Sequence, residues 1–162
     1  MSDARDLEVI RDPLWDNIRL DRPALAALDT PVVQRLRYVR QVGHAFLVYP
    51  GATHTRFEHA LGAYHLAGRA LAMFDERDGA SGPHRAGAAV VRCAALLHDI
   101  GHYPYSHALE EIGALHHEEV ARPLVTTGAV AEVLREGISS GVCGGGASEC
   151  KMKSCPGNSS WK

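Results

Sequence analysis

The sequence predicts an all-α domain, and three features of the 162-residue chain support this prediction. Apolar residues recur at spacings of three and four over residues 32–42 and 57–71, which is the pattern of a helix with one buried face. Residues 86–97 are so rich in alanine, valine and leucine that they indicate a largely buried helix. Hydrophobic residues make up 46% of the chain and charged residues 22%, as in an ordinary globular core.

Charge and hydropathy exclude several classes of protein. The net charge of −2 gives no bulk attraction to nucleic acid or to anionic lipid. No apolar stretch reaches eighteen residues, and the acidic N-terminus lacks the apolar segment of a secretion signal. We therefore expect no membrane association, a cytoplasmic location and free thiols at the four cysteines.

The N-terminal third predicts short elements. Residues 9–22 mix β-branched and polar residues around one proline, which indicates an extended segment or a short hairpin. Residues 23–28 are long enough for one or two helical turns. A further helix is expected to begin at Pro31, after a capping side chain, and to end at Gly43.

Three arginines, Arg35, Arg37 and Arg40, lie on this expected helix. Charged residues spread over a helix ordinarily form a solvated face. We expect this of Arg35 and Arg40.

The middle of the chain predicts a crossing segment and then a long helix. Residues 44–53 are aromatic and β-branched and end in Pro-Gly, so a strand-like crossing and a turn are expected. Thr55 can cap the helix that follows. His59 lies at the margin of its apolar stripe, where it points into a cleft or is a satisfied core histidine. Residues 75–84 are expected to form a loop.

The rest of the chain up to residue 136 predicts helices. Residues 86–97 are expected to form a central, mostly buried helix. Ser106 can cap a short helix that reaches Ile112. Two more short helices are expected over residues 117–125 and 129–136.

The composition changes at Gly137, where the apolar periodicity ends. Too few apolar residues follow to form a packed core, which predicts one domain over residues 1–136 and a disordered tail over residues 137–162. Three tail cysteines lack the paired spacing of a zinc ribbon, so no metal is expected there.

Residues 94–107, A-A-L-L-H-D-I-G-H-Y-P-Y-S-H, are the chemically richest stretch. An imidazole and a carboxylate side by side at a helix end, His98 and Asp99, can hold one divalent metal and leave positions open. Such a pair can also be structural, with the aspartate fixing the imidazole tautomer. Clustering favours the metal, because five more histidines lie nearby in the sequence: His59, His102, His107, His116 and His117.

Four motifs occur in order, over residues 29–38, 49–59, 96–107 and 116–118. They read D-T-P-V-V-Q-R-L-R-Y, Y-P-G-A-T-H-T-R-F-E-H, L-L-H-D-I-G-H-Y-P-Y-S-H and H-H-E. Together they resemble the HD-domain phosphohydrolases, and most closely the deoxynucleoside triphosphate triphosphohydrolases, over about residues 10–125. The resemblance implies an HD-domain helical bundle, which we expect to be incomplete on its C-terminal side.

The resemblance implies a divalent metal held by a histidine, a consecutive His-Asp and a later aspartate. By motif position the ligands are His59, His98 and Asp99, with manganese, iron, magnesium, nickel or zinc as the metal. No aspartate follows Asp99 in the chain. We therefore expect a site weakened by the loss of one charged ligand.

The resemblance also implies a set of catalytic residues. His107 corresponds to the catalytic histidine and Glu110 to its partnering acid, while His102 and His117 match two more active-site histidines. Hydrolysis of a phosphoester needs neutralised charge, an activated water and a proton for the leaving oxygen, and a histidine oriented by a carboxylate can supply that proton.

The motifs also imply a set of substrate-binding residues. Arg56 matches an arginine that contacts the triphosphate, and Gln41 and Val42 match residues at the sugar and base end of the pocket.

Asp29, Gln34 and Arg37 match a regulatory guanine-nucleotide site that supports a homo-oligomer in the full-length family. A helix cap with surface charges explains these three residues equally well.

The leading hypothesis is a metal-dependent enzyme with a nucleotide substrate, converting a deoxynucleoside triphosphate to deoxynucleoside and triphosphate, as a dGTPase does. The alternatives are an HD phosphatase or phosphodiesterase acting on another nucleotide, an inactive nucleotide-binding module, and an unstable fragment.

Overall fold

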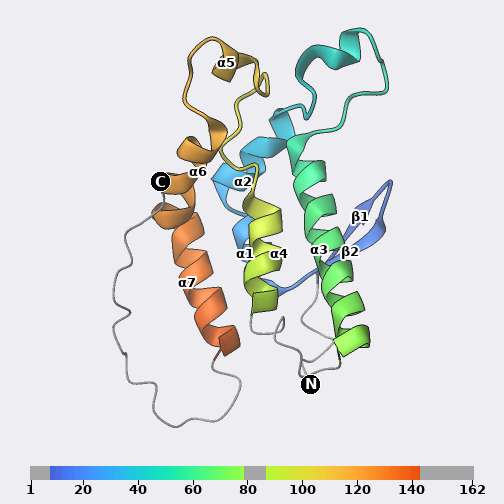
Figure 1. The fold of residues 1–162 in the computed structure, drawn as a ribbon, viewed down its shortest axis with the longest axis vertical. Helices are drawn as coiled ribbons and strands as arrows, with labels where there is room; N and C mark the ends of the chain where they lie inside the picture. Colours follow the sequence, from blue (N-terminus) through green and yellow to red (C-terminus); the bar gives the residue numbers. More distant parts are fainter. Residues whose placement is uncertain (1–7, 79–86, 143–162) are drawn as a thin grey trace.

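The computed structural model describes residues 8–78 and 87–142. They form a helical domain with one small hairpin, so the all-α prediction is confirmed (Figure 1). The elements in chain order are β1 (Glu8–Asp12), β2 (Asp16–Leu20), α1 (Arg22–Leu28), α2 (Pro31–Gln34), the 3₁₀ helices η2 (Arg35–Tyr38) and η3 (Gly43–Leu47), α3 (Arg56–Asp78), α4 (Ala88–Leu97), α5 (Ala108–Glu111), α6 (His117–Thr126) and α7 (Gly128–Val142).

The N-terminal hairpin packs against α3. Asp12 Oδ1 accepts hydrogen bonds from the amides of Leu14 and Trp15, at 2.8 and 2.9 Å, and so closes the turn between the antiparallel strands. The Trp15 indole then lies over Gly62, where an added Cβ would come within 2.8 Å of Nε1. The absence of a side chain at Gly62 therefore allows the predicted hairpin to dock on the helix.

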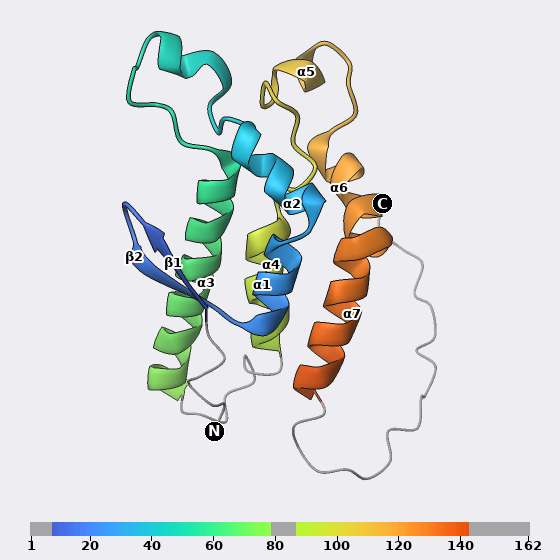
Figure 2. The ribbon, with the colours of Figure 1, turned by 180° about the vertical axis from the view of Figure 1, so that it is seen from behind.

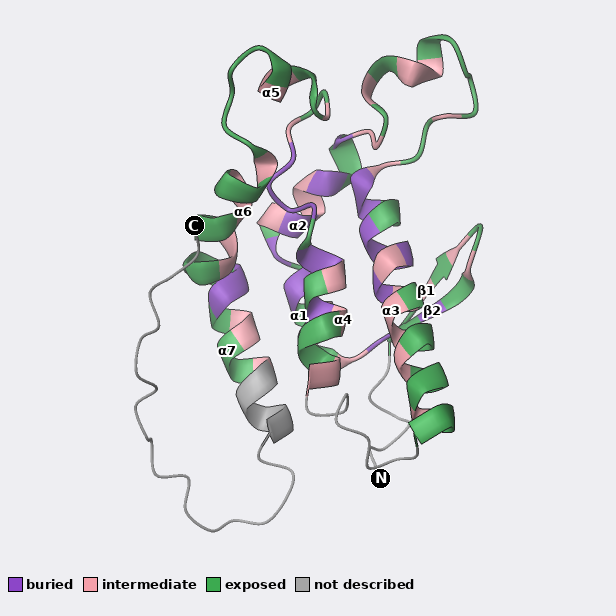
Figure 3. Cartoon of the chain, viewed as in Figure 1, coloured by how far each residue is buried: buried purple, intermediate pink, exposed green. Residues whose placement is uncertain are grey.

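The core lies where α1, α3, α4 and α7 face one another, and buried residues concentrate there (Figures 2 and 3). Burial of each large aliphatic side chain contributes about 1.5–3 kcal/mol. The core therefore fixes the start of α3 and the end of α4. Its largest aliphatic members are Ile18, Leu20, Leu28, Leu36, Leu61, Leu96, Leu97 and Ile100.

The helix expected from Pro31 to Gly43 ends earlier than predicted. It divides into α2 and η2, and the chain is extended at Val39. The Val39 carbonyl accepts a hydrogen bond from the amide of Arg56 at 2.8 Å, and Arg40 forms an isolated bridge with Thr55. Backbone pairing with this later segment replaces the helical hydrogen bonds.

The strand-like crossing expected over residues 44–53 is wrong. The chain forms η3 and a turn, in which the amides of Val48 and Tyr49 bond to the Ala45 carbonyl at 3.0 and 2.8 Å. A strand needs a partner, and the bridge between Arg40 and Thr55 is the only backbone pairing beside this segment among the described residues.

Two further boundaries differ from the predictions. Helix α3 continues to Asp78, so the loop expected over residues 75–84 starts later, and its remainder lies outside the described residues. Helix α7 continues past Gly137, the expected start of the tail. Residues 143–162 lie outside the described part of the chain, where the disordered tail stays a prediction.

Helix α4 is less buried than its composition indicates. Cys93, Leu96 and Leu97 are buried, but Val90 and Val91 are about half exposed. The described helices cover one face of α4 and leave the other open. None of the helices over residues 8–78 and 87–142 combines the length and apolar character needed to cross a lipid bilayer.

Candidate metal centre

The first turn of α3 positions two of the predicted site residues. The Thr55 hydroxyl accepts from the Glu58 amide at 3.4 Å, and the Glu58 carboxylate accepts from the Thr55 amide at 2.5 Å. This reciprocal pair is a capping box, which fixes where the helix begins. Arg56 and His59 then lie three residues apart, on one face of the helix.

The end of α4 positions the other two ligand candidates. His98 Nδ1 lies 2.9 Å from the Ala95 carbonyl oxygen, and a carbonyl can only accept, so Nδ1 carries the proton. In the neutral form of this tautomer the lone pair is on Nε2. In the following turn the His102 amide donates to the Asp99 carbonyl at 3.1 Å, and the Asp99 side chain is buried.

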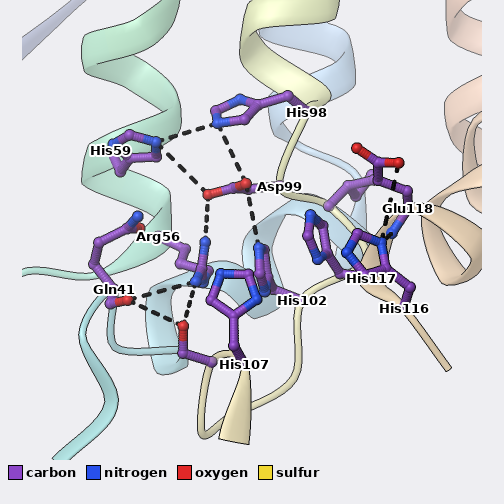
Figure 4. Close-up of polar contacts among 12 residues, drawn as sticks. Gln41, Arg56, His59, His98, Asp99, His102, His107, His116, His117 and Glu118 are labelled. Carbon is purple, nitrogen blue, oxygen red and sulfur yellow. Dashed lines mark hydrogen bonds and ion pairs between the residues drawn. The ribbon is translucent and has the colours of Figure 1, made fainter. Parts of the chain in front are cut away.

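The three predicted metal ligands converge (Figure 4). His59 Nε2 lies 3.1 Å from His98 Nε2 and 3.6 Å from Asp99 Oδ2, and His98 Nε2 lies 3.3 Å from Asp99 Oδ1. Nitrogen and oxygen ligands about 2.0–2.2 Å from one cation lie about 3.0–3.5 Å from one another. The donor atoms therefore fit one divalent cation.

The orientation and exposure of the rings also fit a metal. The His59 and His98 rings meet at 63°, so both can direct in-plane lone pairs to a common point. Their side chains are 40% and 42% exposed, which leaves room for water or substrate. Partial burial is the main cause that lowers the pKa of His59, and this favours the neutral, metal-binding form.

Asp99 is held in its charged form. Burial raises the pKa of this carboxyl, but the hydrogen bond from His102 and the nearby charges of His98 and Arg56 outweigh burial and hold the pKa well below its usual range. A carboxylate ionised at neutral pH supplies the anionic ligand that a divalent cation requires.

Arg56 lies on the other side of Asp99 (Figure 4). Its guanidinium is 3% exposed and donates to Asp99 Oδ2 at 2.5 Å and to the Ser106 hydroxyl at 2.6 Å. Ser106 does not cap the next helix as predicted, because His107 is the residue that precedes α5 and the serine hydroxyl bonds to Arg56 instead. The contact of Arg56 with a triphosphate stays a prediction.

Glu110 joins two of the predicted catalytic histidines. Its carboxylate accepts from His107 Nδ1 at 3.1 Å, from His117 Nδ1 at 2.8 Å and from the His117 amide at 3.1 Å. Loss of solvation raises the pKa of Glu110, but these hydrogen bonds outweigh it and lower the pKa to about 2. Glu110 is therefore a fixed anion that orients both imidazoles, as the predicted role of a partnering acid requires.

His102 is the buried member of the histidine cluster. Its Nε2 lies 3.4 Å from Asp99 Oδ1, while Nδ1 has no hydrogen-bond partner among the described residues. Its ring stacks on that of His117 at 3.8 Å and 14°. Parallel stacked rings cannot direct their in-plane lone pairs to one ion, so His102, His107, Glu110 and His117 suit proton transfer better than metal binding, although their donor atoms are close.

A cavity of about 640 Å³ brings most of the predicted residues together, although His98 and Glu110 do not line it, and its volume is typical of sites for nucleotide-sized ligands. Sequence reasoning missed two residues in its wall, His44 and Tyr105, whose rings stack at 5.0 Å. Of these two residues, only Tyr105 could have been predicted from sequence, because it lies within the histidine-rich motif. The predicted residues that line the cavity are Gln41, Val42, Arg56, His59, Asp99, His102, His107 and His117.

The three candidate regulatory residues take part in local contacts. Gln34 Nε2 donates to the Leu28 carbonyl at 2.8 Å, and Arg37 Nε donates to Gln34 Oε1 at 2.7 Å. The Arg37 guanidinium lies 3.6 Å above the centre of the Phe57 ring, and Asp29 is exposed. These contacts account for Gln34 and Arg37 without a ligand, so the regulatory nucleotide site stays a prediction.

The depressed pKa of Glu110 predicts a specific pH dependence of stability. A carboxyl with a pKa of 4.5 when unfolded and about 2 when folded stabilises the native state above pH 4.5 and loses this contribution as the pH falls towards 2. Glu110→Gln should remove this contribution. Urea unfolding at pH 5, 4 and 3 should show a smaller loss of unfolding free energy for the variant, and equal losses would contradict the prediction.

The fold and the site define a class of protein, an α-helical domain with a histidine–aspartate cluster between two helices that can hold a metal ion. The model of the HD domain matches residues 56–138, slightly over half of the chain. The chain therefore belongs to the HD-domain family.

Relatives agree with this assignment. Deoxynucleoside triphosphate triphosphohydrolase SAMHD1 of Bos taurus is 39% identical over 104 residues, which cover 64% of this chain and 18% of the relative. An uncharacterized protein of Methanocaldococcus jannaschii is 42% identical over 110 residues, 68% of this chain and 22% of the relative. The chain thus spans about a fifth of the length of these relatives.

Solved structures share the fold. A phosphohydrolase of Bacteroides thetaiotaomicron superposes with a TM-score of 0.67 at 33% identity, over 80% of this chain and 34% of the other. A hypothetical protein of Aquifex aeolicus gives a TM-score of 0.66 at 36% identity, over 80% and 33% of the two chains.

Proposed function

We propose that the protein is a metal-dependent phosphohydrolase that converts a deoxynucleoside triphosphate to the deoxynucleoside and inorganic triphosphate. The observation that carries the proposal is the position of Asp99 in the cavity wall. One side of its carboxylate faces His59 and His98, and the other faces Arg56 and His102. Candidate metal ligands and candidate cationic or proton-carrying groups would therefore meet around one carboxylate.

A divalent cation held by His59, His98 and Asp99 would supply Lewis acidity and a water of lowered pKa. The residues of the chain supply the remaining requirements. Arg56 lines the cavity and would supply positive charge beside phosphate oxygens, while its two terminal nitrogens donate to Asp99 and Ser106. His107, oriented through Nδ1 by Glu110, can deliver a proton from Nε2 to the leaving 5′ oxygen of the sugar.

The choice of substrate rests on two further observations. The cavity volume of about 640 Å³ suits a nucleotide, and Gln41 and Val42 would contact its sugar and base. The bovine relative is named as a deoxynucleoside triphosphate triphosphohydrolase, and the Bacteroides structure as a phosphohydrolase.

A product assay tests the proposal. The protein with Mn²⁺ and each deoxynucleoside triphosphate should release tripolyphosphate and deoxynucleoside. Orthophosphate alone would indicate a phosphatase instead. No product combined with a raised melting temperature would indicate an inactive nucleotide-binding module.

Replacement of His107 tests the proton donor. His107→Ala should lower kcat about 10²–10⁴-fold, the usual contribution of general acid catalysis. His65→Ala is the matched control. This histidine lies on α3, its ring contacts that of Trp15, and it does not line the cavity. Equal kcat values for the two variants would contradict the assigned role.

A further inference from the structure

Arg35 does not lie on a solvated face, contrary to the expectation from sequence. Its guanidinium is partly buried and donates twice, from Nη1 to the His102 carbonyl at 2.9 Å and from Nη2 to the Ile100 carbonyl at 2.8 Å. Both acceptors belong to the turn that follows α4 and carries Asp99. One planar side chain therefore holds two carbonyl groups of the metal-site turn.

These carbonyl groups need an external donor. Ile100 and His102 lie beyond the last residue of α4, so their carbonyls receive no helical hydrogen bond, and a buried carbonyl without a donor is costly. Within the turn, the amides of Ile100 and His102 already bond to the carbonyls of Leu97 and Asp99 at 3.1 Å. Arg35 supplies the missing donors from η2, and its fork fixes the two acceptors relative to each other.

The contact reaches the metal site through His102. The His102 side chain is 2% exposed, and its Nε2 lies 3.4 Å from Asp99 Oδ1. A shift of the His102 backbone would therefore move the ring that orients the anionic metal ligand. Ligand-orienting contacts of this kind commonly change metal affinity 10–100-fold.

We propose that Arg35 is a positioning residue of the metal centre, which holds the carbonyls of Ile100 and His102 so that Asp99 and His102 keep their places. The inference rests on the metal centre of the proposed function. Arg35 contacts neither substrate nor metal in this scheme, and it acts through the turn.

Metal affinity provides the main test. Calorimetric titration with Mn²⁺ should give a Kd at least about tenfold higher for Arg35→Gln than for the wild type, with Arg35→Lys between the two. Arg40→Gln is the matched control, because Arg40 also donates to a backbone carbonyl, that of Thr53 at 2.7 Å, which is not part of the turn after α4. Its Kd should equal that of the wild type.

Two readouts separate positioning from general loss of stability. In metal-free protein, hydrogen exchange at the amides of Ile100 and His102 should be at least about tenfold faster in Arg35→Gln and unchanged in Arg40→Gln. A cavity of about 410 Å³ borders Arg35, Gly101 and His102, so a small cation can enter where the side chain is removed. Millimolar methylguanidinium should therefore restore Mn²⁺ affinity to Arg35→Ala but not to Asp99→Ala.

Unchanged Mn²⁺ affinity in a folded Arg35→Gln variant would overturn the inference and leave the proposed function intact. Absence of Mn²⁺ binding in the wild type would contradict the metal centre itself, and the inference would fall with it. Arg35→Lys and the exchange rates decide the question if Arg35→Gln is poorly folded.

Discussion

Asp99→Ala is expected to lose the divalent cation and, with it, about a thousandfold or more of the phosphohydrolase rate. The Asp99 carboxylate is the one anion in the ligand set, 3.6 Å from His59 Nε2 and 3.3 Å from His98 Nε2. Metal-assisted charge stabilisation supplies several kcal/mol in the transition state, and each 1.36 kcal/mol corresponds to a factor of about ten. Plasma mass spectrometry of the purified variant should find little bound metal.

The same substitution should also destabilise the fold. Arg56 is 3% exposed on its side chain and would lose its buried counter-ion. Removal of one partner from a buried ion pair costs about 3–5 kcal/mol. Urea unfolding should therefore show a markedly lower unfolding free energy for Asp99→Ala.

Asp99→Asn separates the two effects. The amide keeps the shape of the side chain and can still accept from Arg56, so its stability loss should be smaller while metal is lost as before. Glu118→Gln is the control, since that carboxylate is 80% exposed on α6. Stoichiometric metal that resists a chelator in Asp99→Asn would rule out Asp99 as a ligand.

Sequence reasoning succeeded where the signal is local or carried by a motif. Thr55, the predicted cap, begins α3 and so places Arg56 and His59 in its first turn, and the apolar run before His98 marks the end of α4. Convergence of the three ligand candidates then needs only that the two helices pack side by side, which their apolar faces favour.

Sequence reasoning failed where the partner lies far along the chain. Arg35 has the spacing of a solvated residue, but its two acceptors are more than sixty residues away. Residues 44–53 have the composition of a strand, yet the fold offers them no strand to pair with. Propensity describes the local conformation and exposure that a residue favours by itself. Tertiary contacts determined the position of Arg35 and the conformation of residues 44–53.

Gly101→Ala is expected to displace α6 and to disrupt the histidine cluster. A Cβ at Gly101 would lie 2.6 Å from the Ala121 amide nitrogen and 3.1 Å from Ala121 Cα, both backbone atoms of α6 that cannot rotate away. Overpacking of this kind costs about 1–3 kcal/mol. Because α6 begins at His117, its displacement would break the bonds of His117 to Glu110 and its stack on His102.

The rate should fall about a hundredfold, since a displacement of about 1 Å at a catalytic group has an effect of that size. Gly51→Ala is the control, because a Cβ there meets no atom within 4 Å. Mn²⁺ affinity in Gly101→Ala should remain near the wild-type value, because the ligands come from α3 and the end of α4 while Arg35 holds the turn. If Mn²⁺ affinity and rate fell together, the substitution would have moved the turn that carries Asp99 instead of α6. The contact of Arg35 with that turn would then be too weak to hold it in place.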